Sequence, residues 1–398
     1  VIVLTDPADY EVVIEGLKTG DVPVEVKRYL AGKVFNLTSA YDAAVSRFML
    51  GSENPEENEL QHYYTMPLEK SQELRYGENA HQKAALYLTA DHKGAFGGME
   101  QFQGKELSYN NIRDLDVAWK AVSAYNKFVK NAESVKSDDG STVNFAGTEG
   151  SIFTIALKHN TPCGAALGKD ALDSYKKTYE CDPVSIFGGI IGCSGTIDKA
   201  AAEEMVKCFL EVIVAPDFTE EALEVFKAKK NLRIIKATVE ATEFFDSMSV
   251  DGGLLVQSRD NQLFEKWNVV TKAKPTQEQI DEMAFGMTVA MFAKSNAILV
   301  IKNKTAYGIG CGQTNRIWAA DQALSRAKEK TDALGIGNAE VLISDAFFPF
   351  ADCVEKANEY GIKAIVQPGG SIRDQESIEA CNKYGIAMIF TGTRHFKH

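Results

Sequence analysis

The stretch "IKAIVQPGGSIRDQESIEACNKYGIAMIFT", residues 362–391, decides the fold class. It contains an apolar run of strand length, a helical segment that ends at Gly385, and a second apolar run. A glycine directly after a helix suits the left-handed C-terminal cap. The same order precedes it, with the apolar run "AEVLIS" (339–344) and the helical "DCVEKANEYG" (352–361). Short strands that alternate with helices indicate an α/β fold with a mostly parallel sheet.

A polar segment follows each of these three strands. The segments are "SDAFFPFAD" (344–352), "QPGGSIRD" (367–374) and "TGTRHFKH" (391–398). Ligands of open α/β sheets bind at the carboxyl ends of the strands. We therefore expect the three segments to share one edge of the sheet.

An earlier stretch has the same pattern. "SIFTIAL" (151–157) reads as a buried strand, "KHNTPCG" (158–164) as the loop at its carboxyl end, and "ALGKDALDSYKKTYE" (166–180) as the helix beyond. Lys158 and His159 would then emerge where ligands usually bind. The alternative interpretation, about equally well supported by this pair alone, is that neither residue binds a ligand. Lys158 would then be a solvated loop residue and His159 a packing residue.

Two further clusters are typical of binding sites. "YGIGCGQTNRI" (307–317) places Gly308, Gly310 and Gly312 before a helix with Arg316, so a ligand could approach backbone N–H groups there. The spacing matches neither a dinucleotide fingerprint nor a Walker A loop. "LRYGENAHQ" (74–82) gathers several recognition-type side chains in one short turn.

The composition excludes several classes of protein. The 398 residues are 45% hydrophobic and 25% charged, which is typical of a globular protein of two or three domains. A net charge of -12 without a basic run argues against a nucleic-acid surface. No apolar stretch has the length of a membrane span. The opening "VIVLTDPADY" does not resemble a signal peptide, and its start in mid-strand suggests a missing N-terminal part.

The seven cysteines, at 163, 181, 193, 208, 311, 353 and 381, form no CxxC pair. An odd number without a framework fits reduced thiols in a cytoplasmic protein. "NTPCGAA" contains the Pro-Cys pair of zinc deaminases, but the Glu two residues after the His and the second Cys of their signature are missing. Zinc hydrolysis is therefore disfavoured.

We expect three regions. Residues 1–68 combine a short apolar strand, helices and an acidic linker, "GSENPEENELQ" (51–61). A second break lies near "WNVVTKAKPTQEQ" (267–279), where Pro275 and Thr276 could start a helix. This division gives residues 69–268 and 269–398 as two further domains.

Ten blocks of the chain resemble, in order, the transformylase part of the family that combines AICAR transformylase with IMP cyclohydrolase. They are "LRYGENAHQ", "GKELSYNN", "KHNTPCG", "DPVSIFGG", "EVIVAP", "KSNAI", "YGIGCGQTNRI", "SDAFFPF", "QPGGSIRD" and "RHFKH". "DPADY" and "FNLTSAYDAAVSRFM" resemble the end of the cyclohydrolase domain. The Asp-Ile-Gly-Gly and Ala-Ala-Lys-Asn segments that serve cyclisation in the family are absent from the chain.

The resemblance implies two cytidine-deaminase-like three-layer α/β/α subdomains, preceded by a short α/β remnant. It implies a cytoplasmic homodimer with sites at the interface and without a catalytic metal, membrane or nucleic-acid partner. The implied reaction moves the formyl group of 10-formyltetrahydrofolate to the 5-amino group of AICAR, in purine biosynthesis. The products are FAICAR and tetrahydrofolate, and we do not expect this chain to close FAICAR to IMP.

The resemblance also assigns site residues. Lys158 matches the cation beside the formyl oxygen, His159 the base, and Asn296 a side chain that assists the transfer. The positions matched to AICAR contacts are Arg75, Tyr76, Asn111, Gly188, Glu211 and Arg394. The positions matched to the folate side are Arg316, Phe347, Asp352, Ser371 and Ile372. Taken singly, Phe347 could be plain core and Arg316 a solvated helix residue.

The chain departs from the family at three positions. Ala80 replaces a usual Pro, Ala351 a frequent Arg, and Cys353 a small or polar residue. The last two bear on folate binding. A non-catalytic nucleotide-binding sensor or assembly partner is the alternative function, although retention of Lys158, His159 and Asn296 argues against it.

Overall fold

The computed structural model describes residues 1–51, 59–89, 93–130, 135–137, 140, 142–143, 150–241 and 245–398. The chain forms two compact units. Residues 1–73 and 85–97 form the N-terminal unit, and residues 74–84 and 98–398 form the main unit. No helix in the described ranges is long and apolar enough to cross a membrane.

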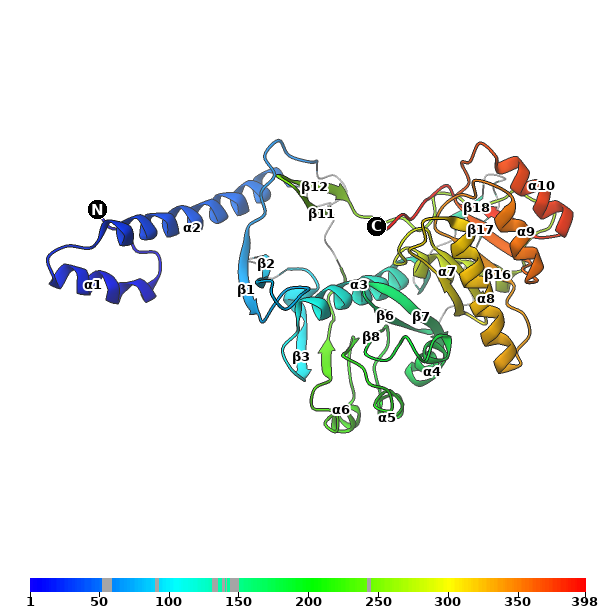
Figure 1. The fold of residues 1–398 in the computed structure, drawn as a ribbon, viewed down its shortest axis with the longest axis horizontal. Helices are drawn as coiled ribbons and strands as arrows, with labels where there is room; N and C mark the ends of the chain where they lie inside the picture. Colours follow the sequence, from blue (N-terminus) through cyan, green and yellow to red (C-terminus); the bar gives the residue numbers. More distant parts are fainter. Residues whose placement is uncertain are drawn as a thin grey trace. The chain divides into compact units, whose positions relative to one another are not determined.

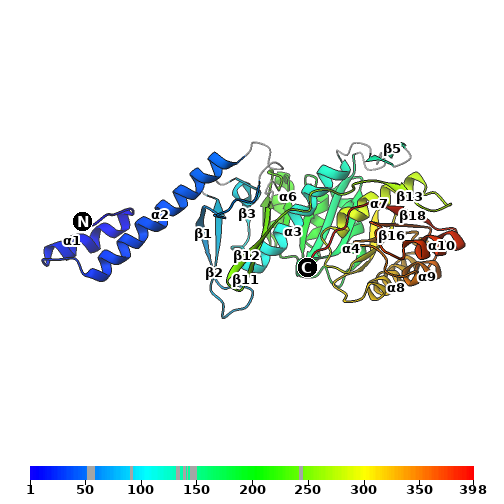
Figure 2. The ribbon, with the colours of Figure 1, turned by 90° about the horizontal axis from the view of Figure 1, so that it is seen from above.

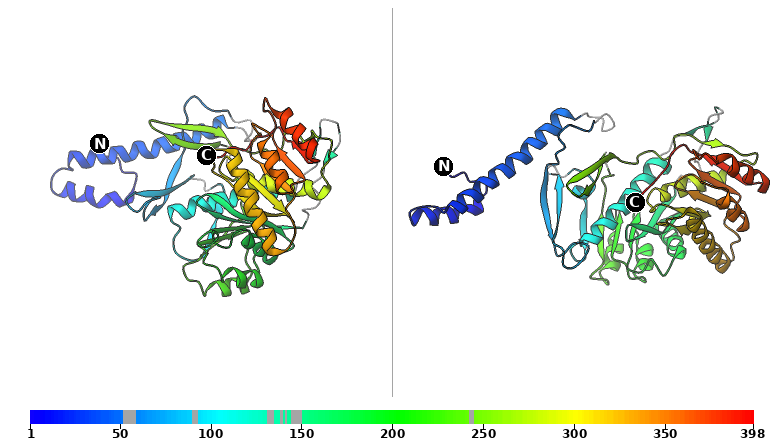
Figure 3. Two further views of the ribbon diagram at one scale, coloured as in Figure 1. Left: turned by 45° about the vertical axis from the view of Figure 1, so that its right-hand side comes forward. Right: turned by 45° about the horizontal axis from the view of Figure 1, so that its top comes forward.

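The N-terminal unit contains the helices α1 (Tyr10–Lys18) and α2 (Val24–Leu50), which lie side by side (Figure 3). Strands β1 (Leu68–Leu74) and β2 (Ala84–Thr89) form a separate two-stranded sheet. The strand expected at residues 1–4 does not form. Ile2 and Leu4 instead pack against the buried side chains of the helix pair, so this part is helical rather than α/β. Most of the expected linker, residues 52–58, lies outside the described residues.

A twelve-stranded sheet is the framework of the main unit (Figures 1 and 2). Its strands, in spatial order, are β13 (Asn268–Val269), β18 (Ala387–Phe390), β17 (Ala364–Gln367), β16 (Val341–Ser344), β14 (Ile298–Lys302), β15 (Thr305–Gly310), β7 (Thr161–Gly168), β6 (Ile152–Lys158), β8 (Ile190–Cys193), β9 (Val212–Ala215), β10 (Arg233–Lys236) and β3 (Glu100–Gln103). The major helices are α3 (Tyr109–Tyr125), α4 (Ala171–Cys181), α5 (Lys199–Met205), α6 (Glu220–Phe226), α7 (Gln277–Ala290), α8 (Arg316–Leu334), α9 (Asp352–Glu359) and α10 (Asp374–Tyr384). Two small hairpins pair β4 (Val135–Lys136) with β5 (Thr142–Val143), and β11 (Phe245–Val250) with β12 (Gly253–Ser258).

The sheet is parallel only in its two wings. Strands β16, β17 and β18 are parallel, as the sequence predicts, and so are β8, β9 and β10. The six central strands, from β16 through β14, β15, β7 and β6 to β8, pair antiparallel. The prediction of a mostly parallel sheet is thus wrong at the centre, because two β-hairpins stand where connecting loops and helices were expected.

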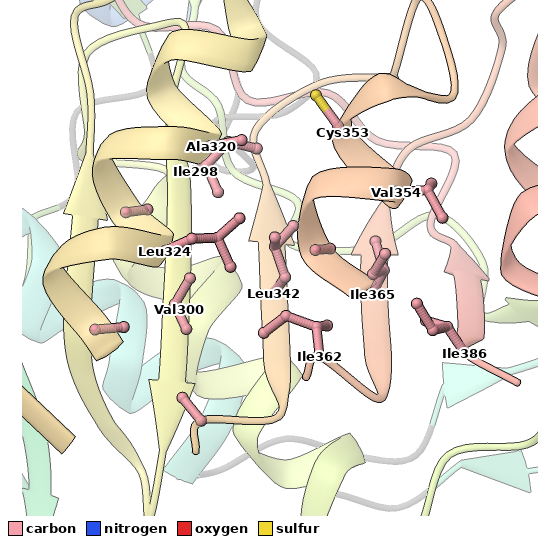
Figure 4. Close-up of a cluster of buried hydrophobic side chains, with 14 of the residues drawn as sticks. Ile298, Val300, Ala320, Leu324, Leu342, Cys353, Val354, Ile362, Ile365 and Ile386 are labelled. Atoms are coloured by element: carbon pink, nitrogen blue, oxygen red, sulfur yellow. The ribbon is translucent and has the colours of Figure 1, made fainter. Parts of the chain in front are cut away.

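Helices cover both faces of the sheet, which gives three α/β/α layers. On one face, Ile298 and Val300 pack against α8 and α9 together with side chains of the parallel wing (Figure 4). The neighbouring Ile301 points to the other face, where it meets Gly286 of α7. Since successive strand side chains alternate between faces, β14 contributes side chains to the cores on both faces of the sheet.

One order of elements occurs twice in the main unit. A short edge strand, a helix, a β-hairpin, a helix and then alternating strands and helices run from β3 and α3 to β10, and again from β13 and α7 to β18. The repeats meet where β7 pairs with β15.

The segment after Lys158 is a hairpin, not a loop leading to a helix. His159 and Asn160 both have left-handed φ angles, 56° and 58°, and the flanking Lys158 and Thr161 pair across them. Positive φ at both central residues is the pattern of a type I′ turn, whose twist matches that of paired strands. The composition "TPCG" resembles a loop, yet Pro162 stands near the start of β7, where a missing N–H is tolerated.

The sequence suggests that Gly308 and Gly310 form a turn that a ligand can approach. Both instead belong to strand β15. A Cβ on Gly308 would lie 2.0 Å from the Ala323 carbonyl oxygen, and one on Gly310 would lie 2.1 Å from that of Ala319. These glycines therefore let α8 pack directly on the strand. Only Gly312, with φ of 66°, has the turn conformation that the pattern suggested.

Candidate functional site

Most of the residues predicted for the site lie at one edge of the large sheet. The pairing directions bring together the carboxyl ends of β6 and of β15 through β18, and the amino ends of β14, β8, β9 and β10. We call this the site edge. Lys158 and His159 follow β6, Gly188 and Glu211 precede β8 and β9, Asn296 precedes β14, Arg316 follows β15, and Phe347, Asp352, Ser371, Ile372 and Arg394 follow the parallel wing. The three polar segments after β16, β17 and β18 share this edge, as expected.

The Lys158–His159 pair is fixed by the hairpin turn. The backbone N–H groups of His159 and Asn160 donate to the two carboxylate oxygens of Asp114 on α3, at 3.3 and 2.6 Å. The His159 side chain is exposed, and Lys158 is half-buried. Lys158 Nζ donates to the Phe187 carbonyl oxygen at 2.8 Å. An ammonium group has three donors, so two remain for a bound oxygen.

Asn296 belongs to a buried polar cluster with Arg316 and Asp345. Arg316 Nη2 donates to Asn296 Oδ1 at 2.6 Å, and Asn296 Nδ2 donates to the Gln313 carbonyl oxygen at 2.8 Å. Arg316 is 6% exposed and Asp345 is fully buried, and the two form an ion pair. Arg316 is therefore no solvated helix residue. Its guanidinium group compensates a buried carboxylate and orients the Asn296 amide.

Two of the residues predicted for AICAR, Asn111 and Glu211, meet near the start of α3. Asn111 is buried, closes a capping box with Ser108, and donates to Glu211 Oε2 at 3.4 Å. Arg233, which sequence reasoning missed, donates to the same oxygen at 2.8 Å. Gly188, with φ of 73°, donates its N–H to the Phe209 carbonyl oxygen.

The turn that carries Arg75 and Tyr76 is held near the same helix. Glu78 of this turn forms an ion pair with Arg113 of α3 at 2.9 Å. The exposed Arg75 guanidinium lies 4.8 Å from the centre of the Tyr76 ring.

The residues predicted for folate are more dispersed. Among the hydrogen bonds of the described residues, none joins one of them directly to Lys158. Phe347 is half-buried, whereas the neighbouring Phe348 is core. Asp352 begins α9, Ser371 Oγ accepts from the Arg373 N–H at 3.1 Å, and Ile372 is fully exposed. Cys353, the second residue of α9, is buried in the core, and burial raises the pKa of its thiol.

A cavity of about 1040 Å³ lies beside the hairpin turn and is lined by Asn160 and Arg394. Its other basic lining residues, which sequence reasoning missed, are Arg113, Lys120, Lys127, Arg259, Lys294, Lys397 and His398. Acidic residues contribute as well, namely Asp116, Glu240, Asp246 and Asp260. Burial and nearby Lys120 lower the pKa of Lys397 to about 8. Basic residues outnumber acidic ones, so the cavity suits an anionic ligand.

Two signals could have identified this lining. Arg113, Lys120 and Lys127 recur every seven residues, which puts them on one side of a helix. Lys294 stands in the "KSNAI" block, two residues before Asn296. The C-terminal segment itself is anchored by His395, whose ring nitrogens lie 2.6 Å from Asp260 Oδ2 and 3.1 Å from the Leu263 carbonyl oxygen.

The described residues contain no group of three or more His, Cys, Asp or Glu side chains arranged to hold a metal ion. All seven cysteines lie within the described ranges, and each is a free thiol.

Comparison with known proteins gives a consistent result. A family model described as "AICARFT/IMPCHase bienzyme" matches residues 1–326. The chain is 54% identical to the bifunctional purine biosynthesis protein PurH of Clostridium acetobutylicum and 52% identical to that of Brachyspira hyodysenteriae. Each match covers 100% of this chain and 72% of the relative. The chain therefore belongs to the AICARFT/IMPCHase bienzyme family.

Proposed function

We propose that the protein transfers the formyl group of 10-formyltetrahydrofolate to the 5-amino group of AICAR, giving FAICAR and tetrahydrofolate. The observation that carries the proposal is the Lys158–His159 pair on a rigid turn, at the same sheet edge as Asn296 and beside a cationic cavity. AICAR carries a phosphate and folate carries carboxylates, so both substrates suit such a cavity. Family membership supports the same reaction.

Each group then has a defined task. The 5-amino group is a weak nucleophile and must lose a proton as it attacks, and the exposed imidazole of His159 takes that proton. A C–N bond to AICAR forms, and negative charge develops on the formyl oxygen of the tetrahedral intermediate. The free donors of the Lys158 ammonium stabilise this charge. The bond to folate N10 then breaks, and N10 leaves with the electron pair and takes up a proton.

The remaining residues position the substrates. Asn296 keeps one amide N–H free for the reacting centre, because Arg316 and Gln313 occupy only part of its capacity. Arg316 thus acts on the folate part of the site indirectly, by orienting the Asn296 amide. Arg75, Tyr76, Asn111, Gly188, Glu211 and Arg394 contact AICAR in this proposal, and Phe347, Asp352, Ser371 and Ile372 contact folate.

The proposal includes a cytoplasmic homodimer. Ile372 is fully exposed, and Phe187 and Phe350 are more than 45% exposed on the single chain. A second copy that covers these exposed apolar side chains would let Ile372 line a closed folate site. The seven free thiols favour a reducing compartment.

The proposed domains are residues 1–68, the end of a cyclohydrolase domain with its linker, and residues 69–268 and 269–398, two cytidine-deaminase-like subdomains. The repeated order of elements supports a boundary near residue 268, because the second repeat begins at β13. The division between residues 268 and 269 falls within this two-residue strand.

We expect the purified protein to form tetrahydrofolate and FAICAR from AICAR and 10-formyltetrahydrofolate. Tetrahydrofolate is followed by absorbance, and FAICAR by chromatography. A protein that binds AICAR without forming tetrahydrofolate would be the non-catalytic alternative.

We expect activity to survive exhaustive chelation of divalent metals, because Lys158 takes the charge-stabilising part that a metal ion would otherwise supply. Turnover is measured before and after dialysis against a strong chelator, with metal content by elemental analysis. Stoichiometric zinc whose removal abolishes turnover would contradict this expectation.

A further inference from the structure

The Asp114 carboxylate supports the backbone of the Lys158–His159 hairpin turn. Each of its oxygens accepts one of two consecutive N–H groups, from His159 and Asn160. Both residues have left-handed φ angles, a conformation that is unfavourable for residues other than glycine. Hydrogen bonds to a carboxylate are stronger than those between neutral groups, so Asp114 offsets this cost.

The second repeat contains the same arrangement, a left-handed turn bound by a helix carboxylate, but it lacks the predicted catalytic residues. Asn303 and Lys304 have φ angles of 52° and 54°, and the Lys304 N–H donates to Glu282 Oε1 at 3.2 Å. Glu282 stands five residues after the first residue of α7, Gln277, and Asp114 stands five residues after Tyr109 of α3. Because β14 runs opposite to β6, this turn lies at the edge away from the site.

We infer that Asp114 is a positioning residue for the formyl transfer proposed above. It holds the turn so that the His159 imidazole and the Lys158 ammonium address one reacting centre from adjacent positions. Helix α3 also carries Asn111, so one helix fixes both the catalytic turn and a predicted AICAR contact. The inference rests on the proposed function, and the second repeat offers a comparison in which a carboxylate contacts an equivalent turn away from the site.

The test compares Asp114→Asn with its matched control Glu282→Gln. Each amide retains one acceptor oxygen, so each variant weakens one carboxylate–turn contact. We expect Asp114→Asn to lower kcat by about tenfold to a hundredfold, the cost of a displaced catalytic group, with KM for AICAR within about twofold. Glu282→Gln should keep its kcat. Asp114→Glu, which retains the carboxylate, should recover part of the lost turnover.

Thermal denaturation of all variants separates stability from turnover. If Asp114→Asn does not fold, Asn160→Gly is added, because glycine adopts left-handed φ without strain. Equal kcat values for Asp114→Asn, or for this double variant, and Glu282→Gln would overturn the inference. His159→Ala is measured alongside: if it turns over normally, the catalytic assignment fails, whereas if it is inactive and Asp114→Asn is not, the positioning inference alone fails.

Discussion

Replacing His159 by alanine is expected to lower kcat by at least about a hundredfold, within the range for a lost general base. In the proposed mechanism the imidazole acts on a proton that moves in the transition state, so KM for AICAR should change little. The side chain is exposed at the turn, and its loss leaves no buried cavity. Steady-state kinetics of tetrahydrofolate formation, with AICAR varied at saturating folate, measure both parameters.

The second repeat supplies the control for this variant. Asn303 occupies the first position of the equivalent turn and has a similar left-handed φ. Asn303→Ala should therefore perturb a hairpin in the same way without affecting turnover. Near wild-type turnover of His159→Ala would rule out the role of His159 as the base.

Replacing Lys158 by methionine is expected to cost about 3–4 kcal/mol of transition-state stabilisation, or roughly a hundredfold to a thousandfold in kcat. Methionine keeps most of the length and apolar stem of lysine but removes the charge to which the proposed mechanism assigns stabilisation of the formyl oxygen. Rapid-quench measurement of FAICAR in a single turnover isolates the chemical step from product release.

Lys302 offers a matched comparison, because its Nζ donates to the Asn338 carbonyl oxygen at 2.7 Å as Lys158 does to Phe187. Lys302→Met removes the same kind of contact at the opposite edge of the sheet. A similar loss of turnover in both methionine variants would show that the contact matters only for folding.

The parallel wing could be predicted from the sequence because its signals are local. Each strand of residues 339–391 is a short apolar run, and Gly385 ends α10 in the left-handed conformation that a glycine cap requires. The shared edge of the three polar segments follows from the parallel direction alone.

The hairpins could not be predicted in the same way. The pair His159-Asn160 lacks the glycine that is usual in a type I′ turn, and its backbone is held by Asp114, which lies far earlier in the chain. The glycines of β15 resemble a ligand loop until the packing of α8 is known. Tertiary contacts thus decided these local structures.

The candidate site was predictable as a set of motifs but not as a set of contacts. Lys158, His159 and Asn296 stand in conspicuous polar segments after or before strands. Arg233 lacks such a setting, and its ion pair with Glu211 depends on the pairing of β9 with β10. The buried contact between Arg316 and Asp345 likewise joins segments that are distant in sequence.

The repeated order of elements in the main unit has a historical consequence. It is what tandem duplication of one ancestral gene segment would leave, with the seam between β7 and β15 descended from an interface between two identical chains. After fusion, the two copies no longer needed the same side chains. One turn has lysine followed by histidine, and the equivalent turn of the other repeat has lysine followed by asparagine. Selection could then conserve the sister copy for the scaffold while the first specialised in chemistry.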